Sequence, residues 1–432
     1  MSLKILLLLN LFLIPLLGST GDFGYEQIKV VFFIVSITLI GFVWVFGKHK
    51  LKWNPIKIAS SIFILTLFLT SILGINSRVS FLGNDPYFQG WVVYAYLFLF
   101  SFLISVSKLK LKLIALTLSF GSLFVALVAI KDWVLLTFFN SPVPTYAGRV
   151  VSSFGQPNFY AGFLLLTLPF SYYLFKGSTG ISQGHSLSTQ GVTLYKLSFF
   201  GFFSGLISVA GIFVSYSRSA ILLSLILLIL GLIDQLKIKF RLGLAVFMVI
   251  GVSILIALKL SSGIMGNEVV KPVLTTNPDL TKEPVEKRVY IWPVALQITL
   301  QKPLTGYGLE NISQAFSVYF QENKHPLFEE NLQISPVLIS LKDLNIDRSH
   351  NYLLDLLLFS GLLGLLGWLG LLGVLFKKLG QTYHARGKFV LIVSLVTYLV
   401  WIQFQNQSIV HLIYFWLLVG LTDLDVDKAA DK

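Results

Sequence analysis

The amino-acid sequence predicts an all-α, polytopic membrane protein with about twelve transmembrane helices and one long, partly helical extracytoplasmic loop. The chain has 432 residues, of which 55% are apolar and 12% are charged, and its mean hydropathy is +0.79. Soluble domains carry about a quarter charged residues, so half of the usual charge is missing. The apolar residues also fall into long runs, and a membrane-spanning helix needs about 20 residues.

Twelve apolar runs are candidates for membrane-spanning helices. They cover residues 5–18, 28–47, 57–74, 91–107, 113–137, 158–175, 197–217, 219–234, 242–260, 351–376, 389–403 and 408–421. The first run has a second interpretation, a cleaved signal peptide, because Lys4 precedes it and small residues follow it. Cleavage would leave the orientation of the other spans unchanged.

The placement of Lys and Arg predicts the orientation, since short cytoplasmic loops carry an excess of them. With the N-terminus inside, the inner segments hold nineteen of these residues. The short outer segments hold five, which are Lys29, Arg78, Lys131, Arg149 and Arg218. Both termini are therefore predicted to be cytoplasmic. The net charge of +13 then reflects topology, and we predict no nucleic-acid partner.

This orientation divides the chain into four parts. We predict helices 1–9 within residues 1–260, a long extracytoplasmic loop at 261–350, helices 10–12 within 351–421, and a cytoplasmic tail at 422–432. Two further helices are predicted inside the loop, over residues 286–302 and 310–323. The second has a one-sided apolar stripe at helical spacing, formed by Ile312, Ala315, Phe316, Tyr319 and Phe320. Such a long loop is usually functional.

Composition also excludes several kinds of chemistry. The chain has no cysteine, so disulfides, thiolate nucleophiles and cysteine zinc sites are ruled out. No two histidines have the spacing of metal ligands. We therefore predict neither a metal site nor a bound cofactor.

The candidate catalytic residues are ionisable side chains at the outer membrane boundary, where unpaired charge is costly. Arg218 ends the seventh span within the hydroxyl-rich stretch at residues 215–219, Arg288 follows two glutamates, and His350 opens the tenth span. Each has a structural alternative. Arg218 could be an arginine at a helix end that extends its charged group to the membrane surface. Arg288 could be a salt-bridged loop residue, and His350 could be a residue that only starts a helix.

Weaker candidates for substrate contacts flank these positions. Gln156-Pro157-Asn158 is a helix start whose amides are also suited to sugar hydroxyls or phosphate. Gly306-Tyr307-Gly308 is first a turn and second a place where a ligand can approach the backbone. Glycines at every third position from Gly361 to Gly373 are interpreted as close helix packing.

Taken in order, these segments resemble the O-antigen ligase family of bacterial membrane glycosyltransferases. The family pattern of His, then Asn, nine residues and Gly-x-x-Gly is complete here as His350-Asn351, nine residues, and Gly361-Leu362-Leu363-Gly364. Ser217-Arg218, residues 288–292, residues 303–308 and residues 154–158 also look like family elements. The resemblance covers about residues 75–375.

The resemblance implies a type C glycosyltransferase-like fold and a polyprenyl-diphosphate-linked glycan donor, used at the outer face of the cytoplasmic membrane. It implies metal-independent transfer with inversion at the anomeric carbon. Arg218 and Arg288 are the expected partners of the diphosphate, since planar guanidinium groups bind phosphate oxygens in pairs. His350 is the expected base for the acceptor hydroxyl. Arg149, Gln156, Asn158, Tyr307 and Asn351 are the expected substrate contacts.

Three activities share this machinery and differ in the acceptor: ligation to a lipid anchor such as a lipid A core, polymerisation onto a glycan repeat, and transfer to a protein hydroxyl. The ligase is expected first because the histidine pattern was described for it. A multi-span transporter or lipid flippase is the alternative from another class. It predicts internal repeats and ionisable residues near the middle of the membrane, and the sequence shows no such repeat.

Overall fold

The computed structural model describes residues 3–19, 23–46, 53–177, 189–235, 284–322, 346–381 and 386–424. Within these ranges the chain is helical apart from its connections and one small hairpin. The hairpin pairs β1 (Thr145–Tyr146) with β2 (Arg149–Val150) in antiparallel register. The sequence had not predicted it, because strands of two residues leave no periodic pattern.

The helices follow one another in this order: α1 Leu3–Leu13, η1 Ile14–Leu16, α2 Tyr25–Phe46, α3 Pro55–Ile72, α4 Ser77–Leu82, α5 Trp91–Ser107, α6 Leu111–Phe139, η2 Ser152–Phe154, α7 Pro157–Gly177, α8 Thr189–Val214, α9 Arg218–Gln235, α12 Pro284–Gln301, α13 Ile312–Glu322, α15 Tyr352–Gly380, α16 Arg386–Trp401 and α17 Ile409–Asp423. Both helices predicted inside the long loop are present as α12 and α13. Pro293 lies inside α12.

Eleven of the twelve predicted spans coincide with helices, and the span at 242–260 lies outside the described residues. Among those described, five helical stretches are long and apolar enough to cross a membrane: Tyr25–Phe46, Pro55–Ile72, Leu111–Phe139, Tyr195–Val214 and Tyr352–Gly380. Four more helices are apolar but shorter, including Leu3–Leu16. A multi-pass membrane protein follows, while the predicted number of twelve spans stays a prediction.

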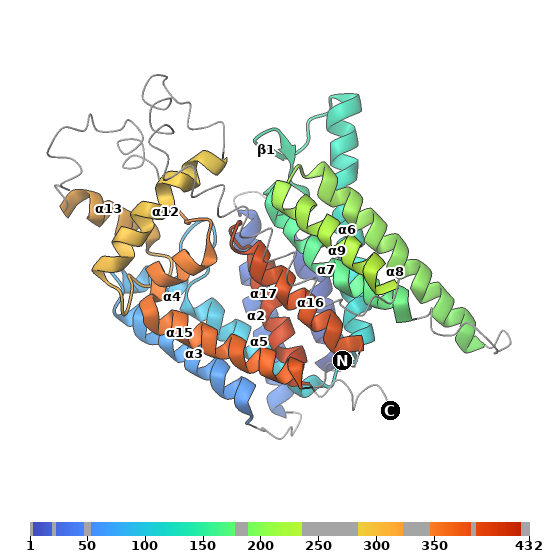
Figure 1. Cartoon of the computed structure of the whole chain (residues 1–432), viewed down its shortest axis with the longest axis horizontal. Coiled ribbons are helices and arrows are strands. Elements are labelled where there is room, and N and C mark those ends of the chain that lie inside the picture. The colour runs from blue at the N-terminus through green and yellow to red at the C-terminus, as the bar shows by residue number, and fades with distance from the viewer. Residues whose placement is uncertain are drawn as a thin grey trace.

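The helices form three neighbouring groups (Figure 1). α3 and α15 pack together on one side, α6, α7, α8 and α9 on the other, and α2, α5, α16 and α17 lie between them. α17 is buried from Ile409 to Thr422, and α7 is buried over most of its length. A helix that is apolar on all sides belongs in a core, and these two supply it.

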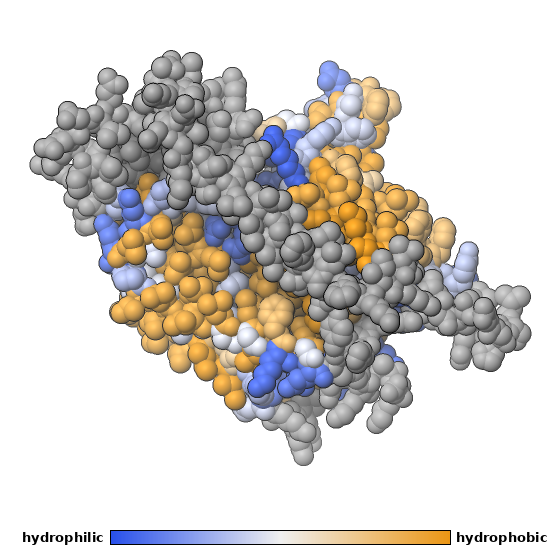
Figure 2. Space-filling view, in the orientation of Figure 1, coloured by the Kyte–Doolittle hydropathy of each residue, from blue (hydrophilic) through white to orange (hydrophobic). Residues whose placement is uncertain are grey.

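The outer surface of the bundle is apolar. Leu39, Leu232 and Leu366 are each at least 60% exposed, and Figure 2 shows hydrophobic residues over the middle of the visible face, with hydrophilic ones toward its ends. Soluble monomers rarely expose apolar area of this extent, so we assign this band to the lipid bilayer.

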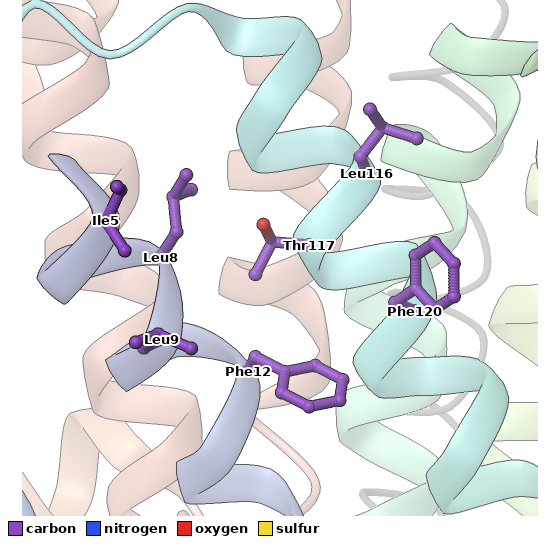
Figure 3. Close-up of a pocket in the computed structure, with 7 residues that line it drawn as sticks. All are labelled: Ile5, Leu8, Leu9, Phe12, Leu116, Thr117 and Phe120. Carbon is purple, nitrogen blue, oxygen red and sulfur yellow. The ribbon is translucent and has the colours of Figure 1, made fainter.

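A lateral groove of about 310 Å³ lies between α1 and α6 (Figure 3). Ile5, Leu8, Phe12 and Phe120 are among its lining residues. Its one polar side chain, Thr117, donates to the carbonyl oxygen of Leu113 at 3.0 Å. The groove therefore suits hydrocarbon chains and offers no polar chemistry.

The two ends of the bundle are distinguished by the contacts that join their helices. At one end the Lys57 ammonium lies 2.9 Å from the Asp423 carboxylate, which joins the start of α3 to the end of α17. At the opposite end, the amide of Ile409 donates to Glu26 at 2.8 Å, which joins the starts of α17 and α2. We call this second end, where α2, α7, α9, α15 and α17 begin, the polar end.

Candidate functional site

α15 is interrupted near the polar end, and a second chain segment fills the gap. Gly361 has φ 58° and ψ −158° inside this helix. Residues 303–308 lie against it: the amides of Tyr307 and Gly308 donate to the carbonyls of Leu358 and Phe359 at 2.7 and 2.8 Å. The amides of Leu362 and Leu363 donate to Pro303 and Leu304 at 2.8 and 3.2 Å. The crossing thus supplies the backbone partners that the kink removes.

This crossing joins two motifs that lie far apart in the sequence, and it requires glycine. A Cβ on Gly306 would lie 2.6 Å from the Leu358 carbonyl oxygen. The packing interpretation of the later glycines holds for Gly367, where a Cβ would meet the Cα of Phe63 in α3 at 3.3 Å. It is wrong for Gly370 and Gly373, where an added Cβ would have no described atom within 4 Å.

Tyr307 is buried in the same crossing. Its hydroxyl donates to the Ile298 carbonyl at 3.1 Å, and it lies 3.2 Å from the Gln301 side-chain oxygen. The Lys302 ammonium is 5.0 Å from the centre of its ring. The hydroxyl therefore bonds to α12, which favours a packing role over the expected contact with substrate.

His350 lies in a short non-helical segment, residues 346–351, that leads into α15. It is half-buried and has φ 60°, in the left-handed region that non-glycine residues seldom adopt. Neighbouring elements hold this segment. The Trp292 indole of α12 donates to the Ser349 carbonyl at 2.8 Å, and the Ser349 amide donates to Asp355 at 2.8 Å. The unusual turn at His350 is thus fixed from both sides.

Asn351 is the N-cap of α15. Its side-chain oxygen accepts from the Leu354 amide at 3.1 Å, as N-cap residues do. Its side-chain nitrogen donates to the Gln403 carbonyl at 3.4 Å. Asn351 therefore has a structural role and also contacts residues 402–408, which connect α16 to α17.

Residues 402–408 link the starts of three helices, and we call them the connecting segment. Gln405 donates to the Ser219 hydroxyl at 3.1 Å, directly beside Arg218. Just beyond the segment, in α17, His411 lies 3.0 Å from the carbonyl of Phe159, the residue after Asn158. The segment and the first turn of α17 thus contact one sequence neighbour of each of Arg218, Asn158 and His350. The sequence interpretation had not singled out its glutamines.

Arg218 is the first residue of α9 and is exposed. The turn before it is buried: Ser215 and Ser217 are both inaccessible, and the Ser217 amide donates to the Ser215 hydroxyl at 3.0 Å. The sequence predicted Arg218 at the end of the seventh span, whereas that helix, α8, ends at Val214 and Arg218 begins α9. The buried hydroxyl turn fixes where its backbone lies.

Arg149 and the Gln156-Pro157-Asn158 motif lie on either side of η2. Arg149 is half-buried on β2, and burial lowers the pKa of its guanidinium, while nearby Tyr160 and Tyr146 oppose that shift. Pro157 begins α7, as predicted. Gln156 and Asn158 are half-buried at this helix start, and the Gln156 carbonyl accepts from the Phe159 amide at 3.1 Å.

Arg288 lies near the start of α12, a helix that packs against α15. Trp292 follows it by four residues, and the Trp292 indole donates to the Ser349 carbonyl at 2.8 Å. This part of α12 therefore contacts the residue before His350.

Arg348 and Glu310 were missed by the sequence interpretation. They form a buried ion pair, and the guanidinium carbon lies 4.5 Å from the Tyr87 ring centre. Burial opposes the charge of Arg348, but Glu310 and Asp355 outweigh it and raise its pKa above the ordinary value. Burial raises the pKa of Glu310, although Arg348 opposes that shift. The sequence did contain a signal for this pair: Arg348 is a charged residue two positions before the His350-Asn351 motif, in a chain with few charges.

The helical bundle and its apolar band define a multi-pass membrane protein, and several candidate residues lie at helix starts of its polar end. The sequence model of the O-antigen ligase family matches residues 203–369, which supports an assignment to that family. The match contains Arg218, Arg288, Tyr307, His350 and Asn351, whereas Arg149, Gln156 and Asn158 lie outside it. No curated protein matches the chain.

Proposed function

We propose that the protein is an O-antigen ligase-like glycosyltransferase. It transfers a glycan from a polyprenyl-diphosphate carrier to a hydroxyl acceptor at the outer face of the bacterial cytoplasmic membrane. The observation that supports this most is the connecting segment, which contacts Asn351 and Ser219 and so brings together the helix starts that carry His350 and Arg218. Both residues lie within the family match.

The arginines stabilise the leaving group in this proposal. As the bond from the anomeric carbon to the phosphate oxygen breaks, the diphosphate takes the electron pair and gains negative charge. Arg218, exposed at the start of α9, and Arg288, in α12, supply paired donors for it. The N-terminus of α9 adds the positive end of a helix dipole to the Arg218 position.

His350 acts on the acceptor. The acceptor oxygen attacks the anomeric carbon from the face opposite the diphosphate, which inverts the configuration, and the imidazole takes the proton that the hydroxyl loses. Its half-buried place in a fixed turn suits a base, because general-base catalysis depends on a positioned group. Gln156, Asn158 and Arg149 contact the donor or acceptor from the α7 side, and Asn351 supports the turn.

The acceptor is left open among a lipid anchor, a glycan repeat and a protein hydroxyl. The proposed site lies at the polar end of the bundle. The excess of Lys and Arg in the inner segments predicts that this end faces the outside and that both termini are cytoplasmic. Membrane lipid surrounds the apolar band, and transfer uses no metal and no cofactor.

The test is reconstitution of the purified protein with a polyprenyl-diphosphate glycan and each acceptor class in turn. Mass spectrometry identifies which acceptor gains the sugar. We expect polyprenyl diphosphate to be released only when an acceptor is present. Unmodified substrate that crosses the bilayer, without transfer to any acceptor, would contradict the proposal and favour a transporter.

A further inference from the structure

Arg348 is buried although it lies at the boundary of the polar end. Its side chain is 5% exposed, and its contacts come from three separate parts of the chain. One terminal nitrogen pairs with Glu310 and lies 3.3 Å from the Gln89 side-chain oxygen. The guanidinium carbon lies 4.5 Å from the Tyr87 ring centre and 5.0 Å from that of Phe359.

Stability alone does not explain this ion pair. Removing two charges from water costs several kcal/mol per ion, and well-packed apolar side chains of similar volume are often equally stable or more so. The second terminal nitrogen of Arg348 is buried without a hydrogen-bond partner in the described part of the chain, which adds to the cost. The pair instead fixes the position of the Arg348 side chain, because a planar guanidinium bonds to its partners in few arrangements.

Arg348 lies two residues before His350, so its ion pair fixes the position of the chain next to the histidine. The segment at 346–351 has no helix or strand of its own, so its shape depends on what holds it. The Ser313 hydroxyl donates to the Ile346 carbonyl at 2.8 Å, and Trp292 holds Ser349. Those contacts bind backbone atoms, whereas the Arg348 side chain reaches inward to α15 and to the loops at Tyr87 and Glu310.

We infer that Arg348, held by Glu310, is a positioning residue that sets the imidazole of His350 for proton transfer. This inference rests on the proposed role of His350. Arg348 touches no substrate in this account. Its side chain anchors the segment that carries His350. Without this anchor, the turn at His350 would relax toward ordinary backbone angles, and the imidazole would move away from the acceptor oxygen.

The test is a double-mutant cycle between Arg348→Met and His350→Ala, with transfer measured by mass spectrometry. We expect Arg348→Met alone to lower kcat at least about tenfold while donor and acceptor KM change less than about threefold. In the His350→Ala background the same substitution should change the rate less than about twofold, since residues that act through one another are non-additive. A purely structural role would give equal losses in both backgrounds.

Lys57→Met is the matched control, because it breaks another largely buried ion pair, with Asp423, at the opposite end of the bundle. It should leave kcat unchanged. If Arg348→Met does not fold, Glu310→Gln enters the same cycle, since an amide is close to the carboxylate in shape.

The outcomes separate the two proposals. Equal losses with and without His350, or a normal kcat in Arg348→Met, overturn the positioning role while leaving the proposed function intact. A normal rate in His350→Ala excludes His350 as the base and overturns the positioning role with it. Absence of transfer by the wild-type protein contradicts the proposed function itself.

Discussion

Gly361 lies directly against the backbone of Leu304. A Cβ added to Gly361 would lie 2.4 Å from both the carbonyl carbon and the carbonyl oxygen of Leu304. The two residues belong to different motifs, and four backbone hydrogen bonds surround their contact. The Gly-x-x-Gly part of the histidine pattern, which begins at Gly361, therefore has a packing role: it holds residues 303–308 of the long loop against α15, the helix that follows His350.

Gly361→Ala should destabilise the protein strongly. The backbone angles of Gly361 are almost exclusive to glycine and cost about 1–3 kcal/mol for other residues, and the contact with Leu304 adds steric overlap. Gly370→Ala is the matched control, because Gly370 is helical and an added Cβ there would have no described atom within 4 Å. It should be neutral or stabilising by up to about 1 kcal/mol. Thermal unfolding in detergent measures both, and equal midpoints would show that the crossing does not hold α15.

The sequence predicted most of the helices correctly because membrane-spanning runs are long and continuous. It placed α13 through its apolar stripe and α7 through the Pro157 start. The interruption at Gly361 was not predictable, since its cause lies about sixty residues earlier in the chain, at Leu304.

The site was predicted in part for a similar reason. His350, Asn351 and Arg218 belong to recognisable local motifs. The positions of His350 and Asn351 at a helix start were expected, whereas Arg218 was expected at the end of the seventh span and instead begins α9. Arg348 and Glu310 are recognised only as an ion pair between residues 38 positions apart in the sequence. The glutamines at 403–407 are recognised only through their contacts with neighbouring helices. Tyr307 resembled a ligand residue locally, yet its hydroxyl bonds to α12.

Reporter fusions test the orientation. Fusions after Leu109 and Gly380 should report a cytoplasmic location, and fusions within residues 265–345 an external one, because nineteen Lys and Arg lie in the inner segments and five in the short outer ones. A cytoplasmic long loop would place the polar end on the wrong side for a donor used outside.

Chelation tests metal independence. The arginines carry the charge stabilisation in the proposed mechanism, so EDTA should leave the transfer rate unchanged, and added Mg²⁺ or Mn²⁺ should not raise it. A strict requirement for either ion, restored by the ion after chelation, would assign the chemistry to a different class of glycosyltransferase.

Replacement of Arg218 or Arg288 by Lys should lower both donor affinity and rate, although charge is retained. Lysine offers a single ammonium where arginine offers a planar fork for two phosphate oxygens. Arg78→Lys is the matched control, since Arg78 lies exposed in α4, outside the proposed site. Donor binding and turnover should be measured separately. Wild-type values in both Lys variants would remove the arginines from the diphosphate site.

His350→Ala should lower turnover by about 10² to 10⁴, the usual contribution of a positioned acid or base, and leave donor binding nearly intact. The protein should still fold, because Asn351 caps α15 and Trp292 holds Ser349 without the imidazole. His49→Ala is the control and should transfer normally, because His49 lies between Lys48 and Lys50 in a segment predicted to be cytoplasmic. Binding of labelled donor and single-turnover transfer separate the two steps. Near-normal transfer would exclude His350 as the base. Loss of donor binding would instead place the histidine at the diphosphate, and the acceptor proton would then pass to another group or to water.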